Sequence, residues 1–329
     1  MEITILTEVD LRSCVFMDND SLAEVAEGFS KLAQGGVMLP PILRIEVPEN
    51  HGEVDVKTAH IEGQDSFAIK IASGFHDNQS LGLPTGSGMM ILISAQTGRP
   101  LAVLLDNGYL TDLRTGLAGA IAARHLAREK IENVGVIGSG MQARYQVRSL
   151  RLVREFRRLF VFGIEPDGVD NYSSEMASEL GIEVIKASNP EVVVRESEVV
   201  ITSTPSQKPY LQSGWLHPGL HITAMGSDAE HKQELFSDVF DHVDLVVCDR
   251  KTQALRLGEL HHARAAGSLP PEDEIIELGE LTAGMKPGRV NNNDITVCDL
   301  TGVGIQDTQI ARFAYRRAID NGLGMTIEV

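Results

Sequence analysis

The sequence of 329 residues is poor in cysteine and in basic residues. Its three cysteines, Cys14, Cys248 and Cys298, are odd in number and stand in apolar runs. We therefore expect reduced core thiols rather than a disulfide framework. Lysine and arginine total 29 against 46 acidic residues, which gives a formal net charge of -17. This charge argues against a nucleic-acid partner and against an anionic membrane surface.

Long apolar runs are also missing. No run reaches the ~20 residues of a membrane helix, and the N-terminal residues show no basic region followed by an apolar one. We therefore expect a cytoplasmic protein with no membrane partner. The hydrophobic content of 43% is ordinary, and the length suggests two domains, each able to form a core.

The first part of the chain, up to about residue 125, has a mixed pattern. Capping-box patterns at Thr7–Asp10 and Ser21–Glu24 predict short helices. A largely antiparallel sheet is predicted from strand-like runs separated by turns. These runs are Glu53–Ile61, Phe67–Ala72, Met89–Ser94 and Pro100–Leu105. A helix rich in small residues, Thr111–Arg128, should then pack closely, with the sheet as the expected neighbour.

From about residue 131 strands and helices alternate, which predicts a parallel, doubly wound sheet. The predicted strands are Asn133–Ile137, Leu159–Phe162, Ile182–Ile185, Val199–Thr202, His221–Ala224, Leu245–Cys248 and, as the last, Asp294–Cys298. The helix Gln306–Asp320 follows, and we expect it to return to the first domain. The predicted fold class is therefore α/β, with a Rossmann sheet inserted in a second, α+β domain.

A glycine-rich turn opens this second region. The six residues of the turn follow an apolar strand and begin a helix, the context in which Gly-x-Gly-x-x-Ala binds a dinucleotide. They are Gly138, Ser139, Gly140, Met141, Gln142 and Ala143. Gly138 would permit the turn, Gly140 the approach of the pyrophosphate, and Ala143 close packing of helix on strand. A structural glycine turn is the alternative.

The ribose-binding acid is expected about 20 positions further on. Gly163 stands in the usual place, and Glu165 follows two residues later. No arginine occupies 163–166 to hold a 2′-phosphate, so the pattern favours NAD, with NADP left open. Thr202, Ser203 and Thr204 end another predicted strand and are candidates for the nicotinamide side of the site.

Two cations interrupt apolar patterns in the first region. With Thr111 as the N-cap, Arg114 would stand at the third helical position, where a cation opposes the helix dipole. A nearby anion would explain this choice, and a solvated surface arginine is the alternative. Lys70 interrupts the apolar run Phe67–Ala72, and it equally fits the solvent face of a strand.

Asp228 lies just past a predicted strand, where open α/β sheets bind ligands. It is a candidate acid/base, and Met225 and Gly226 precede it. Alternatively, Ser227 begins a helix and Asp228 only complements its dipole. The neighbours His261 and His262 cannot share a helix face and lack further ligands at metal spacing, so we expect no metal.

With these residues in place, the chain resembles the ornithine cyclodeaminase/μ-crystallin family over nearly its whole length. The motifs that carry the resemblance are Leu39–Arg44, Lys70 with Asp77-Asn78, Leu110–Gly116, Gly138–Ala143, Met225–Asp228 and Asp299–Asp307. The runs Asp106–Tyr109 and Asp228–Lys232 are similar to the ectoine-utilisation branch, whose members are commonly called cyclodeaminases.

The resemblance implies a homodimer in which residues 1–128 with 305–329 form a substrate-binding and dimerisation domain, and residues 129–304 bind the dinucleotide. It implies that Arg44, Lys70 and Arg114 hold the substrate carboxylate, with Lys70 and Asp228 as candidate catalytic residues. Val303 would lie near the nicotinamide. The expected partner is a small amino or imino acid.

One departure concerns the substrate's distal amine, which an acid receives in ornithine cyclodeaminases. Asp55 is the candidate here, but Lys57 adds a cation and admits a second carboxylate. The leading expectation is an NAD(P)-dependent cyclodeaminase, with an imine reductase or amino-acid dehydrogenase as the alternative. A non-catalytic ligand-binding protein and a 2-hydroxy-acid dehydrogenase using His221 or His231 are less consistent with Asp228.

Overall fold

The computed structural model describes residues 2–328, apart from the side chains of His76 and Gln79. The chain forms two compact units, Met1–Arg114 with Val303–Val329 (unit 1) and Thr115–Gly302 (unit 2). The sequence placed these boundaries at 128/129 and 304/305. The first differs because the helix α3 (Tyr109–Leu126) joins unit 2 from Thr115 onward.

Close packing of α3 on α4 (Met141–Leu150) explains that boundary. A Cβ on Gly116 would lie 2.8 Å from the carbonyl oxygen of Tyr145, and one on Gly119 would lie 1.8 Å from Oε1 of Gln146. The small residues of α3 therefore allow the predicted close packing, but their partner is the helix α4 and not the sheet that we expected.

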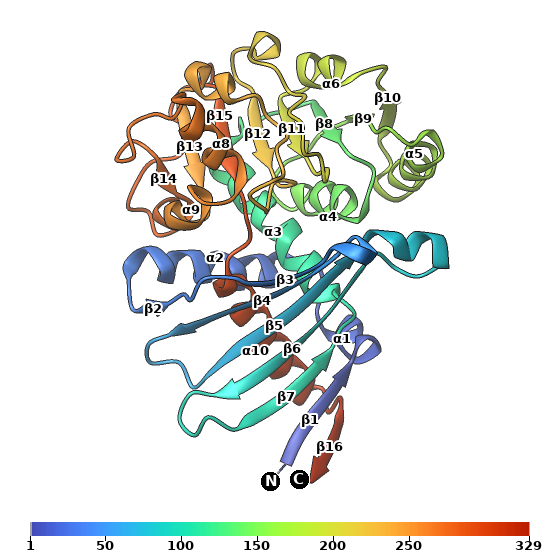
Figure 1. The fold of residues 1–329 in the computed structure, drawn as a ribbon, viewed down its shortest axis with the longest axis vertical. Helices are drawn as coiled ribbons and strands as arrows, with labels where there is room; N and C mark the ends of the chain where they lie inside the picture. Colours follow the sequence, from blue (N-terminus) through green and yellow to red (C-terminus); the bar gives the residue numbers. More distant parts are fainter. Residues whose placement is uncertain (1, 329) are drawn as a thin grey trace. The chain divides into compact units, whose positions relative to one another are not determined.

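An eight-stranded sheet forms most of unit 1, and it is largely antiparallel as expected (Figure 1). In spatial order its strands are β16 (Met325–Glu328), β1 (Glu2–Thr7), β7 (Pro100–Leu105), β6 (Gly86–Ser94), β5 (Ser66–Phe75), β4 (Gly52–Ile61) and β2 (Val37–Met38). The strand β3 (Leu43–Val47) also pairs with β4, and β1 runs parallel to β7.

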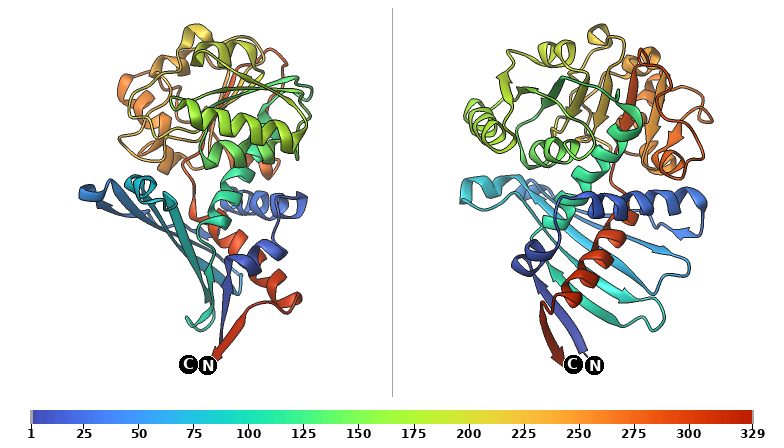
Figure 2. Two further views of the ribbon diagram at one scale, coloured as in Figure 1. Left: turned by 90° about the vertical axis from the view of Figure 1, so that its right-hand side faces the viewer. Right: turned by 180° about the vertical axis from the view of Figure 1, so that it is seen from behind.

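Helices cover one face of this sheet (Figure 2). They are α1 (Glu8–Cys14), α2 (Asn19–Gln34) and α10 (Gly304–Asp320), and α10 packs on β4, β5 and β6. Short 3₁₀ turns at Pro48–Asn50 and His76–Leu81 complete the unit. We call the helix-covered face the inner face and the opposite one the outer face.

The outer face of the sheet is apolar as well. One cross-strand row on it is Thr58, Ile69, Ile91, Val103 and Ile5. These side chains are partly exposed, and the helices of unit 1 lie on the other side of the sheet (Figure 2). An antiparallel sheet with one solvated face would alternate apolar and polar residues, so this face has the composition of an interface.

The helix starts test the capping residues that the sequence predicted. Thr7 caps α1 with the predicted capping box, in which Asp10 accepts from the Thr7 amide. The prediction at Ser21 was wrong, because Asp18 is the cap of α2 and accepts from the amide of Ser21. Thr111 lies inside α3, whose Leu110 amide donates instead to Asp106.

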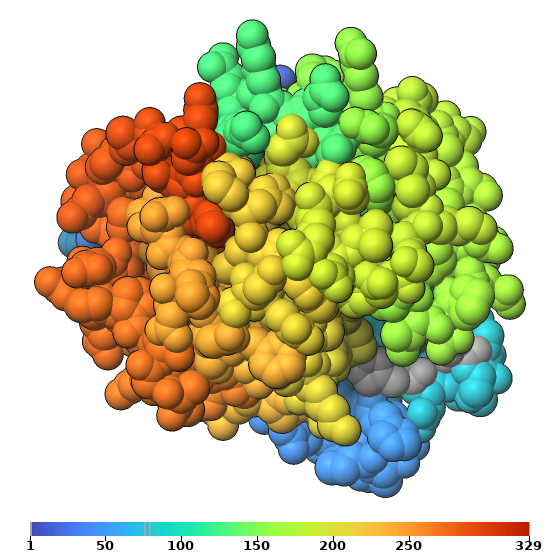
Figure 3. Space-filling model, turned by 90° about the horizontal axis from the view of Figure 1, so that it is seen from above, coloured from blue at the N-terminus to red at the C-terminus, as the bar shows by residue number. Residues whose placement is uncertain are grey.

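Unit 2 contains a parallel eight-stranded sheet, as predicted. In spatial order its strands are β10 (Glu183–Lys186), β9 (Arg158–Phe162), β8 (Asn133–Ile137), β11 (Val199–Thr202), β12 (His221–Ala224), β15 (Thr296–Asp299), β13 (Leu245–Cys248) and β14 (Ile276–Glu277). The first five follow the Rossmann order. The last strand in sequence, β15, lies between β12 and β13. Seen from above, the surface of the molecule changes from green on the right through yellow to orange on the left (Figure 3).

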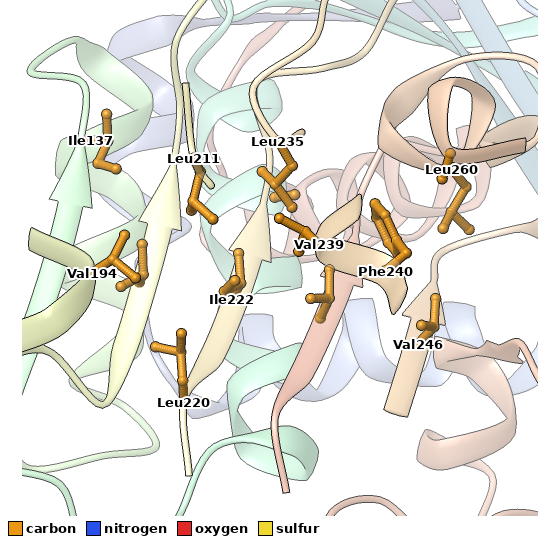
Figure 4. Packing of buried hydrophobic residues seen from close by; sticks show 14 of the residues in the cluster. Ile137, Val194, Leu211, Leu220, Ile222, Leu235, Val239, Phe240, Val246 and Leu260 are labelled. Atoms are coloured by element: carbon orange, nitrogen blue, oxygen red, sulfur yellow. The ribbon is translucent and has the colours of Figure 1, made fainter. Parts of the chain in front are cut away.

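Helices pack on both faces of this sheet, so it is doubly wound. They are α4, α5 (Pro166–Leu180), α6 (Pro190–Glu196), α7 (Lys251–Ala254), α8 (Gly258–Ala266) and α9 (Leu278–Thr282), with 3₁₀ turns at Ser213–Trp215 and Ser237–His242. Neighbouring residues of β11 belong to different hydrophobic clusters. Val200 is in the cluster that includes Val194 of α6 and Leu260 of α8, both labelled in Figure 4, and Ile201 is in the cluster that includes residues of α4 and α5. None of the helices formed by residues 2–328 combines the length and hydropathy of a membrane crossing.

Candidate functional site

The glycine-rich turn follows β8 as the sequence predicted. Gly138 has a φ of +115°, and a Cβ there would lie 2.8 Å from the carbonyl oxygen of Ser203, so only glycine fits. Gly140 precedes α4 with extended backbone, and a Cβ there would meet nothing within 4 Å. The turn thus leaves open space above Gly140, at the N-terminus of a helix, where anions bind favourably.

A pocket of about 500 Å³ opens at this turn. It lies at the carboxyl ends of β8, β9 and β11, where the strand order reverses, the usual ligand position in such sheets. The described residues that line it include no lysine or arginine. They are Ile137, Gly138, Ser139, Gly140, Phe162, Gly163, Ile164, Glu165, Pro190, Ser203, Thr204, Pro205, Ser206 and Tyr210.

Glu165 lines the pocket, and the residues around position 163 leave no room there for an acidic side chain. A Cβ on Gly163 would lie 2.9 Å from Val169 and 3.1 Å from the hydroxyl of Ser139. The side chain of Ser139 therefore fills the space that an acid at the end of β9 would need. Glu165 is exposed, precedes α5 and lines the pocket.

Seven of the predicted cofactor residues lie outside the pocket lining. Ala143 packs in the core, and Met141 is 57% exposed on the first turn of α4 beside Gln142. Thr202 is buried, and Val303 is a buried N-cap of α10 in unit 1. Met225 and Gly226, which follow β12, are also absent from the lining. The structure therefore brings together six of the predicted residues around the pocket, namely Gly138, Ser139, Gly140, Glu165, Ser203 and Thr204.

Glu234, which the sequence analysis missed, organises the strand ends beside the pocket. Its carboxylate is fully buried and accepts hydrogen bonds from the hydroxyls of Thr202, Thr204 and Tyr210 and from the amides of Thr204 and Gly226. Burial raises the pKa of Glu234, and these hydrogen bonds oppose that rise. Gly226 is required here, since a Cβ would lie 2.5 Å from Oε2 of Glu234.

Asp228 lies in a loop and not at a helix start. Ser227 donates to the carbonyl oxygen of Lys232 instead of capping a helix, so the capping-box alternative was wrong. The carboxylate of Asp228 pairs with the ammonium of Lys232 at 2.7 Å and is 37% exposed. Met225 is buried after β12. Asp228 is thus a partly exposed carboxylate beyond a strand end, which a proton-transfer role requires.

In unit 1, Lys70 and Arg114 meet a buried carboxylate. Oδ1 of Asp307 lies 3.1 Å from Nζ of Lys70 and 2.9 Å from Nε of Arg114. Lys70 is 1% exposed and Arg114 is 4% exposed. The solvent-face alternative for Lys70 and the surface alternative for Arg114 were therefore wrong. Asp307, in the first turn of α10, is the shared counter-ion that sequence reasoning missed.

The remaining predicted substrate residues lie on the inner face of the same sheet. Lys57 is directly opposite Lys70 in the register of β4 and β5, and it is 6% exposed. Arg44 is directly opposite Asp55, and its guanidinium donates two hydrogen bonds of 2.7 Å to the two oxygens of that carboxylate. Glu53 lies 3.5 Å from Arg44.

Burial sets the protonation of this group. It lowers the pKa of Lys70 to about 7, assisted by repulsion from Arg114 and Lys57 and opposed by Asp307. Burial also raises the pKa of Asp106 to about 6, and this rise is opposed by the hydrogen bond that its carboxylate accepts from the amide of Leu110. A lysine that titrates near neutral pH is typical of a functional site.

The histidines take structural roles. His221 is fully buried between Thr296 and Thr223, and burial lowers its pKa to about 3, so it is not a general acid. His262 contacts the carbonyl oxygen of Lys232. Among residues 2–328 as described, no group of three His, Cys, Asp or Glu side chains could hold a metal ion.

Comparison with known proteins places this arrangement in a family. The sequence model of the ornithine cyclodeaminase/mu-crystallin family matches residues 1–322. The chain belongs to this family. A family relative, an uncharacterized cyclodeaminase of Sinorhizobium fredii, is 46% identical over 325 residues, 98% of each chain.

Two solved family structures superpose over the whole chain. Thermococcus litoralis Δ1-pyrroline-2-carboxylate reductase, in complex with NADH and L-proline, has a TM-score of 0.93 and 30% identity and covers 99% of this chain and 100% of its own. An archaeal alanine dehydrogenase dimer with bound NAD has a TM-score of 0.91 and 34% identity, covering 100% and 99%.

Proposed function

We propose that this protein is an NAD-dependent oxidoreductase that acts on the Cα–N bond of a small amino or imino acid. The observation that carries the proposal is the pair of buried cations Lys70 and Arg114, which share one oxygen of Asp307 in unit 1. Two buried cations at a single carboxylate favour a further carboxylate as their ligand. Unit 2, taken by itself, carries the pocket at the glycine turn and Asp228.

The residues of unit 2 fit a dinucleotide. The open space above Gly140 would be filled by a side chain at that position, and it lies where helix α4 presents its N-terminal amides. Glu165 suits ribose hydroxyls, and the absence of lysine and arginine from the described pocket lining supports NAD over NADP. NAD, when bound, supplies a hydride acceptor, and NADH supplies a hydride donor.

The chain's own residues then have distinct tasks. Lys70 and Arg114 bind the substrate α-carboxylate and fix its orientation. Asp228 gives a proton to the imine nitrogen during reduction and removes one from the amine in the reverse direction. The overall reaction is imino acid plus NADH plus a proton giving amino acid plus NAD.

The geometry favours this net oxidoreduction over the cyclodeaminase reaction that the sequence favoured. A cyclodeaminase needs an acid for the distal amine, and Asp55 is the candidate. That carboxylate already accepts two hydrogen bonds from Arg44, and the pair Lys57 and Lys70 lies two residues further along β4 and β5. The cyclodeaminase reaction remains the second candidate, supported by the name of the Sinorhizobium relative.

One assay separates these candidates. The purified protein is incubated with NADH and 2-oxo acids in ammonia, and with NAD and amino acids. We expect net nicotinamide oxidation or reduction, and Asp228→Asn should lower kcat by ~10²–10⁴-fold while the Kd for NAD is unchanged. Ammonia release from a diamino acid without net change in NADH would overturn the proposal in favour of a cyclodeaminase. Binding without turnover would indicate a ligand-binding protein.

We further propose a homodimer joined through the outer face of the unit 1 sheet. The row from Thr58 to Ile5 and the exposed residues Met89 and Leu105 make that face apolar across five strands. The dimer seen for the alanine dehydrogenase neighbour supports the assignment. Exposed apolar patches of this kind mark protein interfaces.

A further inference from the structure

The first turn of α4 carries a cation at the end of the helix that favours an anion. With Gly140 as the N-cap, Arg144 is the fourth helical residue, and the first turn contains no acidic side chain. A helix N-terminus has a partial positive charge, so a cation close to it is destabilising unless an anion binds there. Arg144 therefore stands where only specific contacts of its guanidinium would favour it.

The side chain of Arg144 folds back onto the glycine-rich turn. Nη1 of its guanidinium donates two hydrogen bonds, one of 2.6 Å to the carbonyl oxygen of Ser139 and one of 3.0 Å to that of Gly140. A trans peptide holds its N–H opposite its C=O, so the amides of Gly140 and Met141 are directed away from the guanidinium. Among the described residues, none accepts a hydrogen bond from either amide. Both amides are therefore available to a ligand.

The helix α5 holds the guanidinium in this orientation. Nε of Arg144 donates a hydrogen bond of 2.7 Å to Oε2 of Glu175, and the guanidinium carbon lies 5.1 Å from the centre of the Tyr172 ring. Tyr172 is fully buried, and its hydroxyl donates to the carbonyl oxygen of Ala143. The guanidinium thus has partners at its edge, its face and its tip, and only 15% of the Arg144 side chain is exposed.

The next turn of α4 provides an internal comparison. Arg148 also pairs with Glu175 at 2.7 Å, pairs with Glu179 as well, and lies over an aromatic ring, that of Tyr145. Within the part of the chain that the structure describes, its hydrogen bonds go to these two carboxylates alone. Holding α4 against α5 therefore requires no more than Arg148 supplies, and the contacts with the glycine-rich turn are particular to Arg144.

We propose that Arg144 is a positioning residue for the dinucleotide. It fixes two peptide groups of the turn so that the amides of Gly140 and Met141 are presented to the pyrophosphate, and its positive charge lies close behind them. The bound pyrophosphate in turn offsets the unfavourable place of a cation in the first turn of α4. This inference rests on the proposed function only for the binding of NAD, and it is independent of the substrate.

Arg144 also connects the two parts of the pocket that the adenosine diphosphate half of NAD would contact. Glu165, the candidate ribose acid, is the N-cap of α5, and it lines the pocket together with Gly140. Because Arg144 ties the glycine-rich turn to Glu175 and Tyr172 of α5, it acts within unit 2 alone. ADP should therefore report the role of Arg144 as well as NAD does.

The experiment compares NAD and ADP, which carry the pyrophosphate, with adenosine, which lacks it, by displacement calorimetry on the whole chain. We expect Arg144→Met to raise the Kd for NAD and for ADP about 10-fold, with the Kd for adenosine within about 2-fold of the wild type. Arg144→Lys should recover most of the affinity, because its ammonium can still donate to both carbonyl oxygens. Arg148→Met is the matched control: it also breaks a pair with Glu175 and should leave all three Kd values unchanged.

Other outcomes overturn the assignment. If Arg148→Met weakens NAD binding as much as Arg144→Met does, or if adenosine binding falls in parallel with ADP binding, Arg144 only packs α4 on α5. If the wild-type protein binds neither NAD nor ADP, the nucleotide site of the proposed function fails instead. If Arg144→Met does not fold, Arg144→Gln is compared with Arg148→Gln. The first must then bind NAD at least ~3-fold more weakly than the second, and equal Kd values overturn the inference.

Discussion

Buried charges, rather than exposed ones, distinguish the candidate site at the scale of single residues. Lys70 and Arg114 share one oxygen of Asp307. In the other unit, Glu234 accepts hydrogen bonds from three hydroxyls and two amides. Each group would be costly without its partners. A ligand or a substitution that changes the charges or hydrogen bonds around these groups should therefore measurably change their pKa values, the stability of the fold or the binding affinity.

The lowered pKa of Lys70 leads to a proton-uptake prediction. In the free protein Lys70 has a pKa of about 7, so at pH 8 it is mostly neutral. A bound carboxylate stabilises the ammonium and raises this pKa, so binding at pH 8 should take up close to one proton, and affinity should fall as pH rises above 7. Calorimetry of succinate binding in two buffers of different ionisation enthalpy measures this number.

Lys70→Met is the test of the assignment. The variant should show almost no proton uptake at pH 8, because no other lysine of the group has its place beside Asp307 and Arg114. Asp106, with a pKa of about 6, is ionised in the free protein at this pH. Were the uptake the same in the variant, a different group would be responsible.

Glu234→Gln should weaken both stability and NAD binding. The amide that replaces one oxygen cannot accept from donors such as the Thr204 amide, so a buried hydrogen bond is lost at about 1–3 kcal/mol. We expect a thermal midpoint lower by several degrees and a Kd for NAD raised about 10-fold, since Thr204 and Tyr210 line the pocket. Glu191→Gln, in an exposed pair with Arg195, is the control and should change neither quantity.

Sequence reasoning found the residues that are unusual for their immediate sequence neighbourhood. Lys70 and Arg114 break apolar or helix-dipole patterns, and the glycine turn has a fixed spacing. Asp307 and Glu234 carry no such signal, because an acid early in a helix or in a loop is ordinary. Their roles depend on partners far away in sequence, which only the fold brings together.

At the scale of elements, the strands of unit 2 were the most predictable. A central parallel strand is buried on both faces and reads as a continuous apolar run, as β8 and β11 do. β14 has only two residues and β16 is exposed, so neither leaves a pattern. β3 is an edge strand in which charged and apolar residues alternate. The sequence predicted a strand near β15, but not that this strand lies between β12 and β13.

The turn between β8 and α4 gives a prediction that separates a functional glycine from a structural one. Gly140→Ala should leave the thermal midpoint within about 2 °C of the wild type, because its φ of -80° suits alanine and no atom lies within 4 Å. Its Kd for NAD should rise at least ~10-fold, because the methyl group occupies the pyrophosphate position.

Gly138→Ala is the contrasting variant. Its φ of +115° and the carbonyl of Ser203 make any side chain costly, so the thermal midpoint should fall by an amount equivalent to ~1–3 kcal/mol. Fluorescence titration measures the Kd of each variant for NAD. If Gly140→Ala binds NAD with the same Kd as the wild type, the pyrophosphate binds elsewhere.

For the whole molecule, the apolar outer face predicts the oligomeric state. Sedimentation equilibrium should show a dimer at micromolar concentration. Ile91→Arg, in the centre of the outer face, should yield a monomer, because an unpaired guanidinium is costly in an apolar interface. NAD affinity should persist, since unit 2 is unchanged. Gln96→Arg, in an exposed turn of the same sheet, should remain dimeric, and a dimeric Ile91→Arg protein would place the interface on another surface.

The position of β15 has a consequence for biosynthesis. β15 enters the middle of the unit 2 sheet, and the chain then passes directly into α10, which covers the inner face of unit 1 and carries Asp307. While the ribosome is still making residues before 296, the first sheet has no α10 and Lys70 lacks its counter-ion Asp307, and the second sheet has a gap between β12 and β13. Neither unit can finish folding as the chain emerges, so both should complete together, late and in one coupled step.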